Sequence, residues 1–77
     1  MKPIGELIHD RMREQGHTVK EFAQAIGYRR NNAYRIFRQA TIDTGLLIRI
    51  SVFLRHDFFA YYSEEYRKQT AADTHHF

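Results

Sequence analysis

The chain has 77 residues, which allows one domain with a limited hydrophobic core and leaves no room for a second domain. Its hydrophobic share of 43% is ordinary for a folded protein, its net charge of +3 is mildly basic, and it has no cysteine for disulfides or thiolate metal sites. The absence of cysteine suits a reducing cytoplasm. The charged beginning of the chain, without a continuous apolar run, indicates neither a signal peptide nor a membrane anchor.

Apolar residues at helical spacing predict a first helix over residues 4–15, with Gly16 just past its end. Thr18 and Glu21 then have the spacing of a capping box. In this motif the threonine hydroxyl accepts a hydrogen bond from a free backbone N–H, and the glutamate reaches back to the cap. A second helix of about eight residues therefore follows and ends at Gly27. Because so short a helix is marginal in water, it must pack on its neighbours.

A third helix is predicted over residues 30–39. Asp43 is a good N-cap for a fourth helix that runs to Leu54, and Asp57 is a good N-cap for a last short helix over residues 58–66.

No segment shows a plausible strand pattern, so the prediction is an all-α, compact five-helix domain over residues 1–66. Residues 67–77 are polar and lack apolar periodicity, which predicts a flexible C-terminal tail.

The second and third helices form a predicted helix-turn-helix at the centre of this domain. About three residues around Gly27 join them, and so tight a connection forces the helix axes to cross steeply. Ala23 is small enough to let the helices approach, and Gly27 can adopt the positive φ that the turn needs.

The charge around this motif is of one sign. Residues 22–42 contain no Asp or Glu, yet they contain four arginines: Arg29, Arg30, Arg35 and Arg38. Such a segment is the electrostatic footprint expected for binding phosphate. The alternative is an arginine-rich helix face that is only solvated.

Residues 18–23, leading to Ile26 and Gly27, carry a resemblance to a known family, together with the buried positions Ala33 and Ile36 and residues 42–50. Over roughly residues 4–62 the chain resembles the Xre/Cro-repressor family of lambda-repressor-like, five-helix DNA-binding domains. It departs from the family pattern at Arg29, where a capping Ser or Thr is usual, and at Arg55, where Gly or Asn is usual.

The resemblance implies that the third helix enters the major groove of double-stranded DNA. The residues that would face the base edges are Arg30, Asn31, Asn32 and Arg35, with Tyr34 beside them. Arginine matches guanine, and asparagine matches adenine. The residues placed for phosphate contacts are Thr18, Lys20, Arg29, Arg38 and Thr44. The alternatives are that the two asparagines cap the helix locally and that Tyr34 packs on the edge of the core.

Aromatic residues crowd the last third of the chain. One helix cannot bury the neighbouring pairs Phe58–Phe59 and Tyr61–Tyr62 against one small core, so some of these rings must face outward or meet another chain. We therefore expect a homodimer whose interface includes Phe58, Phe59, Tyr61 and Tyr62. Its two recognition helices would read half-sites about 34 Å apart. The alternative is that the tyrosine rings lie flat on the first helix.

The five histidines do not form a spaced metal set, although the adjacent His75 and His76 could hold a stray ion. No nucleophile–base pair or glycine-rich phosphate loop is present, so we expect neither catalysis nor a cofactor.

The predicted function is a sequence-specific transcriptional regulator, a repressor, that binds double-stranded DNA in the cytoplasm. The alternative is a protein-interaction module, such as the antitoxin of a toxin–antitoxin pair, that binds a protein partner through the C-terminal aromatic surface. RNA binding is less favoured, because nothing suggests an aromatic sheet surface on which bases could stack.

Overall fold

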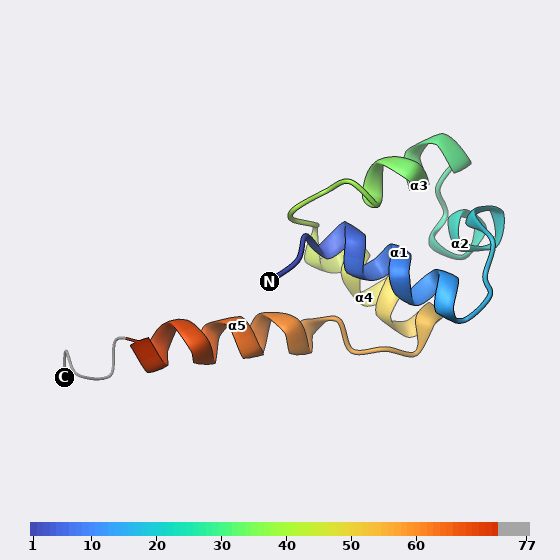
Figure 1. The fold of residues 1–77 in the computed structure, drawn as a ribbon. Helices are drawn as coiled ribbons and strands as arrows, with labels where there is room; N and C mark the ends of the chain where they lie inside the picture. The colour runs from blue at the N-terminus through green and yellow to red at the C-terminus, as the bar shows by residue number, and fades with distance from the viewer. Residues whose placement is uncertain (73–77) are drawn as a thin grey trace.

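Residues 1–72, which the computed structural model describes, form five α-helices and no strand (Figure 1). In chain order these are α1 (Ile4–Glu14), α2 (Val19–Ile26), α3 (Arg30–Ile36), α4 (Thr44–Leu54) and α5 (Phe59–Ala72). The predicted all-α, five-helix fold is confirmed. Within this part of the chain, no helix combines the length and the apolar character that crossing a membrane requires.

The core lies between the first four helices and is closed by one residue just before α5. Its members are Ile4, Ile8, Met12, Phe22, Ala23, Ile26, Ala33, Ile36, Leu46, Leu47, Ile50, Leu54 and Phe58. Within each helix they recur mostly three or four positions apart, with the adjacent pairs Phe22–Ala23 and Leu46–Leu47 widening the stripe, as expected of one buried helix face. Each large side chain buried in this way stabilises the fold by about 1.5–3 kcal/mol.

The predicted caps of α2 and α4 are confirmed. The Thr18 hydroxyl accepts a hydrogen bond from the Glu21 N–H at 3.1 Å, and the Glu21 carboxylate accepts one from the Thr18 N–H at 2.8 Å. Gly27 ends α2 with a φ of 75°, the left-handed conformation that glycine adopts without steric cost. Asp43 Oδ2 accepts a hydrogen bond from the Leu46 N–H at 2.9 Å at the start of α4.

Two side chains from neighbouring helices bind backbone carbonyl groups at helix C-termini. Gln15 donates through Nε2 to the Leu54 carbonyl oxygen at 2.7 Å, which joins the end of α1 to the end of α4. Arg49 donates through Nη1 to the Ile26 carbonyl oxygen at 3.1 Å, which joins α4 to the end of α2. These carbonyls lack a partner within their own helix, so each bond both satisfies an open acceptor and fixes a helix end.

The start of α1 touches the end of α3 directly through the backbone. The Gly5 N–H donates to the Gln39 carbonyl oxygen at 3.0 Å. A Cβ atom on Gly5 would lie 2.0 Å from the Ile36 carbonyl oxygen and 2.7 Å from the Phe37 carbonyl carbon, so no larger residue fits. This contact joins the start of α1 to the residues at the end of α3.

The third helix is shorter than predicted, since it ends at Ile36 and not near Gln39. The chain tightens there: the Arg38 N–H donates to the Arg35 carbonyl and the Gln39 N–H to the Ile36 carbonyl, both three residues back. Such tightening is common in the last turn of a helix.

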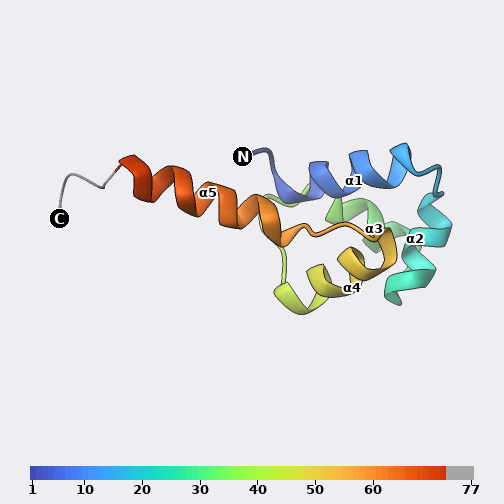
Figure 2. The same cartoon turned by 90° about the horizontal axis from the view of Figure 1, so that it is seen from below.

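The fifth helix is longer than predicted and runs past Tyr66 to Ala72. The added turn has no glycine or proline to stop it, and the Thr70 hydroxyl donates to the Tyr66 carbonyl oxygen at 2.9 Å. Residues 67–72 of the expected tail are therefore helical, and the C-terminal part of α5 extends away from the other helices (Figures 1 and 2). Residues 73–77 lie outside the described part.

Arg55, directly after α4, has a φ of 51° and a ψ of 46°. It is the one non-glycine residue with a positive φ among residues 1–72. Arg55 therefore differs from the glycine or asparagine usual in the family pattern only in residue type. Its backbone still makes the left-handed turn for which those residues are favoured. A side chain in this conformation costs about 1–2 kcal/mol.

Replacing Gly5 with alanine is expected to lower the free energy of unfolding by about 2–4 kcal/mol, because the new methyl group overlaps the α3 backbone and strains the bond to Gln39. Urea unfolding followed by circular dichroism measures this change. The control is Gly45→Ala, whose Cβ would meet only the Asp43 carboxylate at 3.1 Å. It is expected to change the stability by no more than about 1 kcal/mol. Equal effects of the two substitutions would contradict the close contact.

Replacing Arg55 with glycine is expected to raise the free energy of unfolding by about 0.5–1 kcal/mol, because relief of left-handed strain exceeds the added entropy of the unfolded chain. The matched control is Arg13→Gly inside α1, which should lower stability by about 1 kcal/mol. Thermal unfolding of both variants checks the signs. A destabilised Arg55→Gly variant would mean that the arginine side chain makes a compensating contact.

Candidate nucleic-acid interface

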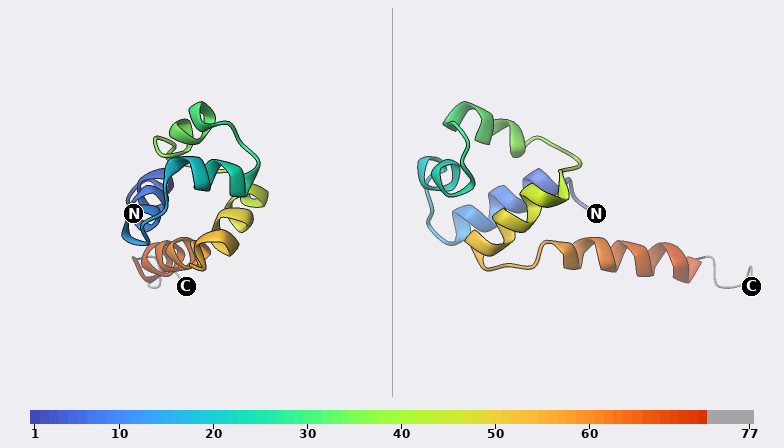
Figure 3. Two further views of the ribbon diagram at one scale, coloured as in Figure 1. Left: turned by 90° about the vertical axis from the view of Figure 1, so that its right-hand side faces the viewer. Right: turned by 180° about the vertical axis from the view of Figure 1, so that it is seen from behind.

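The short helix α3 forms a ridge on the outside of the molecule, on the opposite side from α5 (Figure 3). Three residues, 27–29, join it to α2, and the two helix axes cross steeply: in Figure 1, α2 is seen nearly end-on while α3 lies across the view. Only Ala33 and Ile36 of α3 are fully buried. All five predicted base-contacting side chains are exposed: Arg30, Asn31, Asn32, Tyr34 and Arg35.

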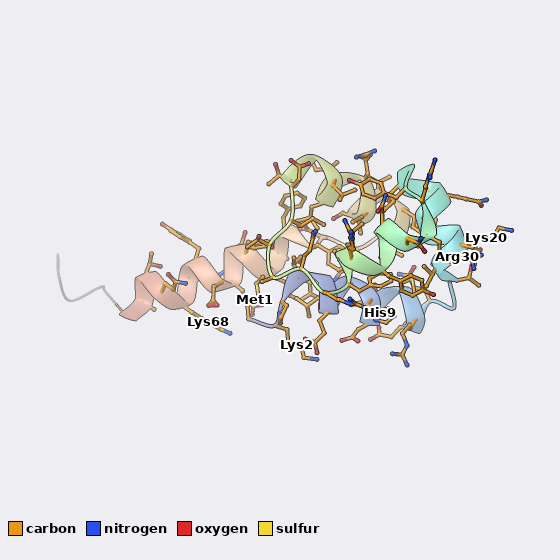
Figure 4. All side chains as sticks on the ribbon, turned by 90° about the horizontal axis from the view of Figure 1, so that it is seen from above. Met1, Lys2, His9, Lys20, Arg30 and Lys68 are labelled. Carbon is orange, nitrogen blue, oxygen red and sulfur yellow. The ribbon has the colours of Figure 1, made fainter. Side chains whose placement is uncertain are left out.

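One flank of α3 faces the beginning of α2. Arg30 and Tyr34 from α3 line a shallow hollow of about 380 Å³ together with Thr18 and Lys20 from the α2 side. Figure 4 shows Lys20 and Arg30 at the same end of the molecule. The structure therefore brings two predicted phosphate contacts next to two predicted base contacts.

The other flank of α3 faces the loop that leads to α4. Asn32 and Arg35 line a second hollow of about 650 Å³ on this side, together with Tyr28, Thr41 and Asp43. Arg30 and Arg35 thus lie against different hollows, and the predicted set of base-contacting residues is divided between the two sides of the ridge. The spacing explains this division, since two residues five positions apart in an α-helix point about 140° away from each other around the helix axis.

The basic side chains of this surface lack acidic partners. Among residues 1–72, ion pairs join Lys2 to Asp10, Arg11 to Glu14, His17 to Glu21, and the amino terminus to Glu65. None involves the five basic residues of the predicted interface, which are Lys20, Arg29, Arg30, Arg35 and Arg38. Their positive charge is therefore not neutralised within the described chain, as a phosphate-binding surface requires.

The predicted phosphate contact at Thr18 differs from the expectation in one respect. Its own N–H already donates to Glu21, so only the following N–H groups at the start of α2 remain open. That hydrogen bond and a second one to the Thr18 hydroxyl group hold the pKa of the Glu21 carboxyl below its ordinary value of 4.5. The same carboxylate lies 4.0 Å from Nδ1 of His17 and forms no ion pair with Lys20.

Arg29 and Thr44 also stand at helix starts. Arg29 precedes α3 in an extended conformation, and its side chain makes no cap hydrogen bond, as expected of arginine. Its exposed guanidinium is free to reach outward. Thr44 follows the Asp43 cap, whose carboxylate adds negative charge, and it lines an apolar groove with Phe59 and Tyr62. Thr44 is therefore poorly placed for a phosphate.

A set of stacked rings supports α3 from behind. His9 of α1 stacks on Phe37, with ring centroids 4.2 Å apart and planes 14° from parallel. Tyr34 meets the same ring edge-on at 6.2 Å, while 46% of the tyrosine remains exposed. Tyr34 thus contacts the edge of the core and also reaches the outer surface. Sequence reasoning missed His9, because a lone histidine on a helix carries no signal of its stacking partner.

The predicted dimer residues do not share one surface. Phe58 is completely buried in the core, so its assignment to an interface is wrong: it precedes α5 and turns inward. The Tyr61 hydroxyl lies 2.9 Å from His56 Nε2, and burial of that imidazole lowers the His56 pKa below its ordinary value. Phe59 and Tyr62 do line an accessible groove.

No known family model, curated protein or solved structure matches the chain. The resemblance to Xre/Cro repressors therefore remains a prediction from the residues. Among residues 1–72, no three histidine, aspartate or glutamate side chains gather as a metal site would require. His75 and His76 lie outside the described residues.

The capping box makes a testable contribution to stability at acid pH. Since the Glu21 pKa is lowered by folding, its stabilisation is present above 4.5 and is lost as the pH falls through the folded-state pKa. The variant Glu21→Gln keeps an acceptor oxygen but cannot titrate, so it should lose less stability than the wild type on acidification. Unfolding titrations at a series of pH values measure this. As control, Glu64→Gln removes a carboxylate without a hydrogen bond in the described chain, and it should follow the wild type.

Proposed function

We propose that this chain is a sequence-specific, double-stranded-DNA-binding regulator of transcription, a repressor, which inserts α3 into the major groove. The observation that supports this proposal best is the basic ridge of α3, exposed along its length and without acidic partners. A helix presented in this way by a three-residue turn suits the width of the major groove. Its site of action is the cytoplasm, where it would meet DNA as a homodimer without a cofactor.

In the proposed complex, the side chains of α3 would have different positions relative to the DNA groove. Asn31 lies opposite the buried Ala33 and Ile36, so it would point deepest into the groove, and Arg35, four residues further on, lies toward the hollow that faces the loop to α4. Arg30 and Tyr34 lie on the α2 flank, and Asn32 lies on the opposite flank. Asparagine and arginine side chains can each form two hydrogen bonds to one base, which is the basis of direct readout.

The remaining basic residues surround this ridge and suit phosphates. Lys20 lies beside Arg30 across the hollow that joins α2 to α3. Arg29 and Arg38 are exposed at the two ends of α3, one before its first residue and one after its last. Contacts at both ends would fix the register of the helix on the duplex without reading its sequence.

A second candidate function is a protein-interaction module, such as an antitoxin. It is favoured by the exposed apolar side chains Ile48 and Val52 on α4, 54% and 72% exposed. With Ala25, Arg49 and Phe53 they line a hollow of about 390 Å³ to which no residue of α3 contributes. Exposed apolar surface of this kind marks protein interfaces. This function and DNA binding use different surfaces, so experiments can separate them.

Selection of bound sequences from random duplex DNA tests the proposed function. The wild type is expected to enrich a defined site, with an affinity that falls steeply as salt increases. Arg30→Ala and Arg35→Ala are each expected to cost about 1–3 kcal/mol at the contacted base pair and to relax the preference there.

The control for these variants is Arg67→Ala, which removes the same charge from α5 on the opposite side of the molecule. It should leave both the selected site and its affinity unchanged. Enrichment of no sequence by the wild type would overturn the proposal and favour the protein-interaction module. Enrichment that is unaffected by both α3 substitutions would show that another surface reads the DNA.

A further inference from the structure

The ring of Phe37, directly after α3, contacts aromatic side chains from three helices. His9 of α1 stacks on it with the two planes 14° from parallel and the ring centroids 4.2 Å apart. Phe22 of α2 lies at 5.4 Å with its plane tilted by 37°, and Tyr34 of α3 meets the ring edge-on at 6.2 Å. Among these three neighbours, His9 is the closest and the most nearly parallel. Its imidazole therefore contributes most to fixing the plane of the Phe37 ring.

Phe37 in turn supports a side chain of the exposed ridge. The planes of Tyr34 and Phe37 are 88° apart, and such an edge-to-face pair is attractive only while the two rings keep their relative orientation. Tyr34 also lines the hollow that contains Lys20 and Arg30. The orientation of Tyr34 at the outer surface therefore depends on the plane of Phe37, and through it on His9.

The side chain of His9 makes this contact without a polar partner in the described part of the chain. The other two histidines of that part differ, since His17 is paired with Glu21 and His56 lies within hydrogen-bond distance of Tyr61. In Figure 4, His9 lies beside α3, on the α1 side. The stack on Phe37 is therefore the interaction that determines where the imidazole lies.

We propose that His9 is a positioning residue of the DNA interface: through Phe37, it holds Tyr34 in the orientation that the duplex meets. The inference rests on the proposed function, in which Tyr34 lies beside the base-contacting residues of α3. His9 lies behind α3 and touches no DNA, so it acts on the ridge from the side of the core.

The physical basis of this role is the space that the imidazole fills. Without it, one face of the Phe37 ring is uncovered, and a close-packed interior relaxes into such a space. The ring then turns toward α1, and Tyr34 loses its edge-to-face partner. The phosphate contacts proposed for Lys20 and Arg29 do not depend on this orientation.

Affinity for two duplexes tests the inference: the site that selection enriches and an unrelated sequence of the same length. His9→Ala is expected to weaken binding to the selected site by about 3–10-fold, which is the loss of one aromatic pair expressed as an affinity ratio. Binding to the unrelated duplex should change by less than about twofold. His9→Phe keeps a ring that can stack, so it should restore the affinity for the selected site.

A double-mutant cycle tests whether His9 acts through Tyr34. Once Tyr34→Ala has removed the side chain that is positioned, adding His9→Ala should cause no further loss of affinity for the selected site. The matched control is His56→Ala, which removes an imidazole that meets Phe58 at 4.8 Å on the side of α5. It should leave the ratio of the two affinities unchanged. Circular dichroism verifies that each variant folds.

Three results would overturn the inference: equal losses on both duplexes, additive losses from His9→Ala and Tyr34→Ala, and no rescue by His9→Phe. If the wild type selects a site and His9→Ala binds it equally well, the positioning role alone is wrong and the DNA-binding proposal stands. If the wild type selects no sequence, the proposed function is wrong and the positioning role falls with it.

Discussion

The arrangement of the helices depends most on the contact between the backbones of α1 and α3, where no side chain lies between them. Gly5 lets the backbone of α1 approach the last turn of α3, and its N–H donates a hydrogen bond to the Gln39 carbonyl oxygen. A helix of seven residues such as α3 does not hold its shape in water by itself. It is held at both ends by neighbouring structure: the left-handed turn at Gly27 joins it to α2, and the Gly5 N–H donates to the Gln39 carbonyl just past its last residue. Without these constraints the exposed ridge would have no defined direction.

This way of holding α3 leaves most of its surface free. Only Ala33 and Ile36 are fully buried, so nearly every other position can carry a polar or basic side chain. The cost is a small contribution of α3 to the core. Interactions elsewhere offset it, notably the bonds from Gln15 and Arg49 to carbonyls at the ends of α4 and α2, which hold the scaffold together around the ridge. The scaffold is thus stabilised mainly by α1, α2 and α4, while most of the surface of α3 stays exposed.

The sequence predicted what depends on neighbouring residues and missed what depends on residues far apart. The capping box at Thr18 and the cap at Asp43 involve residues three positions apart, so they could be identified from spacing alone. The Gly5 contact reaches across more than thirty residues, and nothing in the local pattern of α1 indicates it. Nothing in the sequence distinguishes Phe58 from the three aromatic residues that follow it at positions 59, 61 and 62, so the prediction of Phe58 at an interface is wrong. Phe58 precedes the first residue of α5, and its ring is buried in the core. The lack of a local stop signal explains why α5 continues past the predicted end.

The small size of the α3 ridge explains why so short a chain would bind DNA as the proposed homodimer. One α3 ridge offers few contacts, and a single set of this size would bind DNA weakly and with little discrimination. In the proposed homodimer, the second ridge would meet DNA as an intramolecular event, and its effective concentration would raise the overall affinity without any new contact. This gain requires that dimerisation leave α3 uncovered, so the proposed homodimer would have to form through a surface other than the basic ridge.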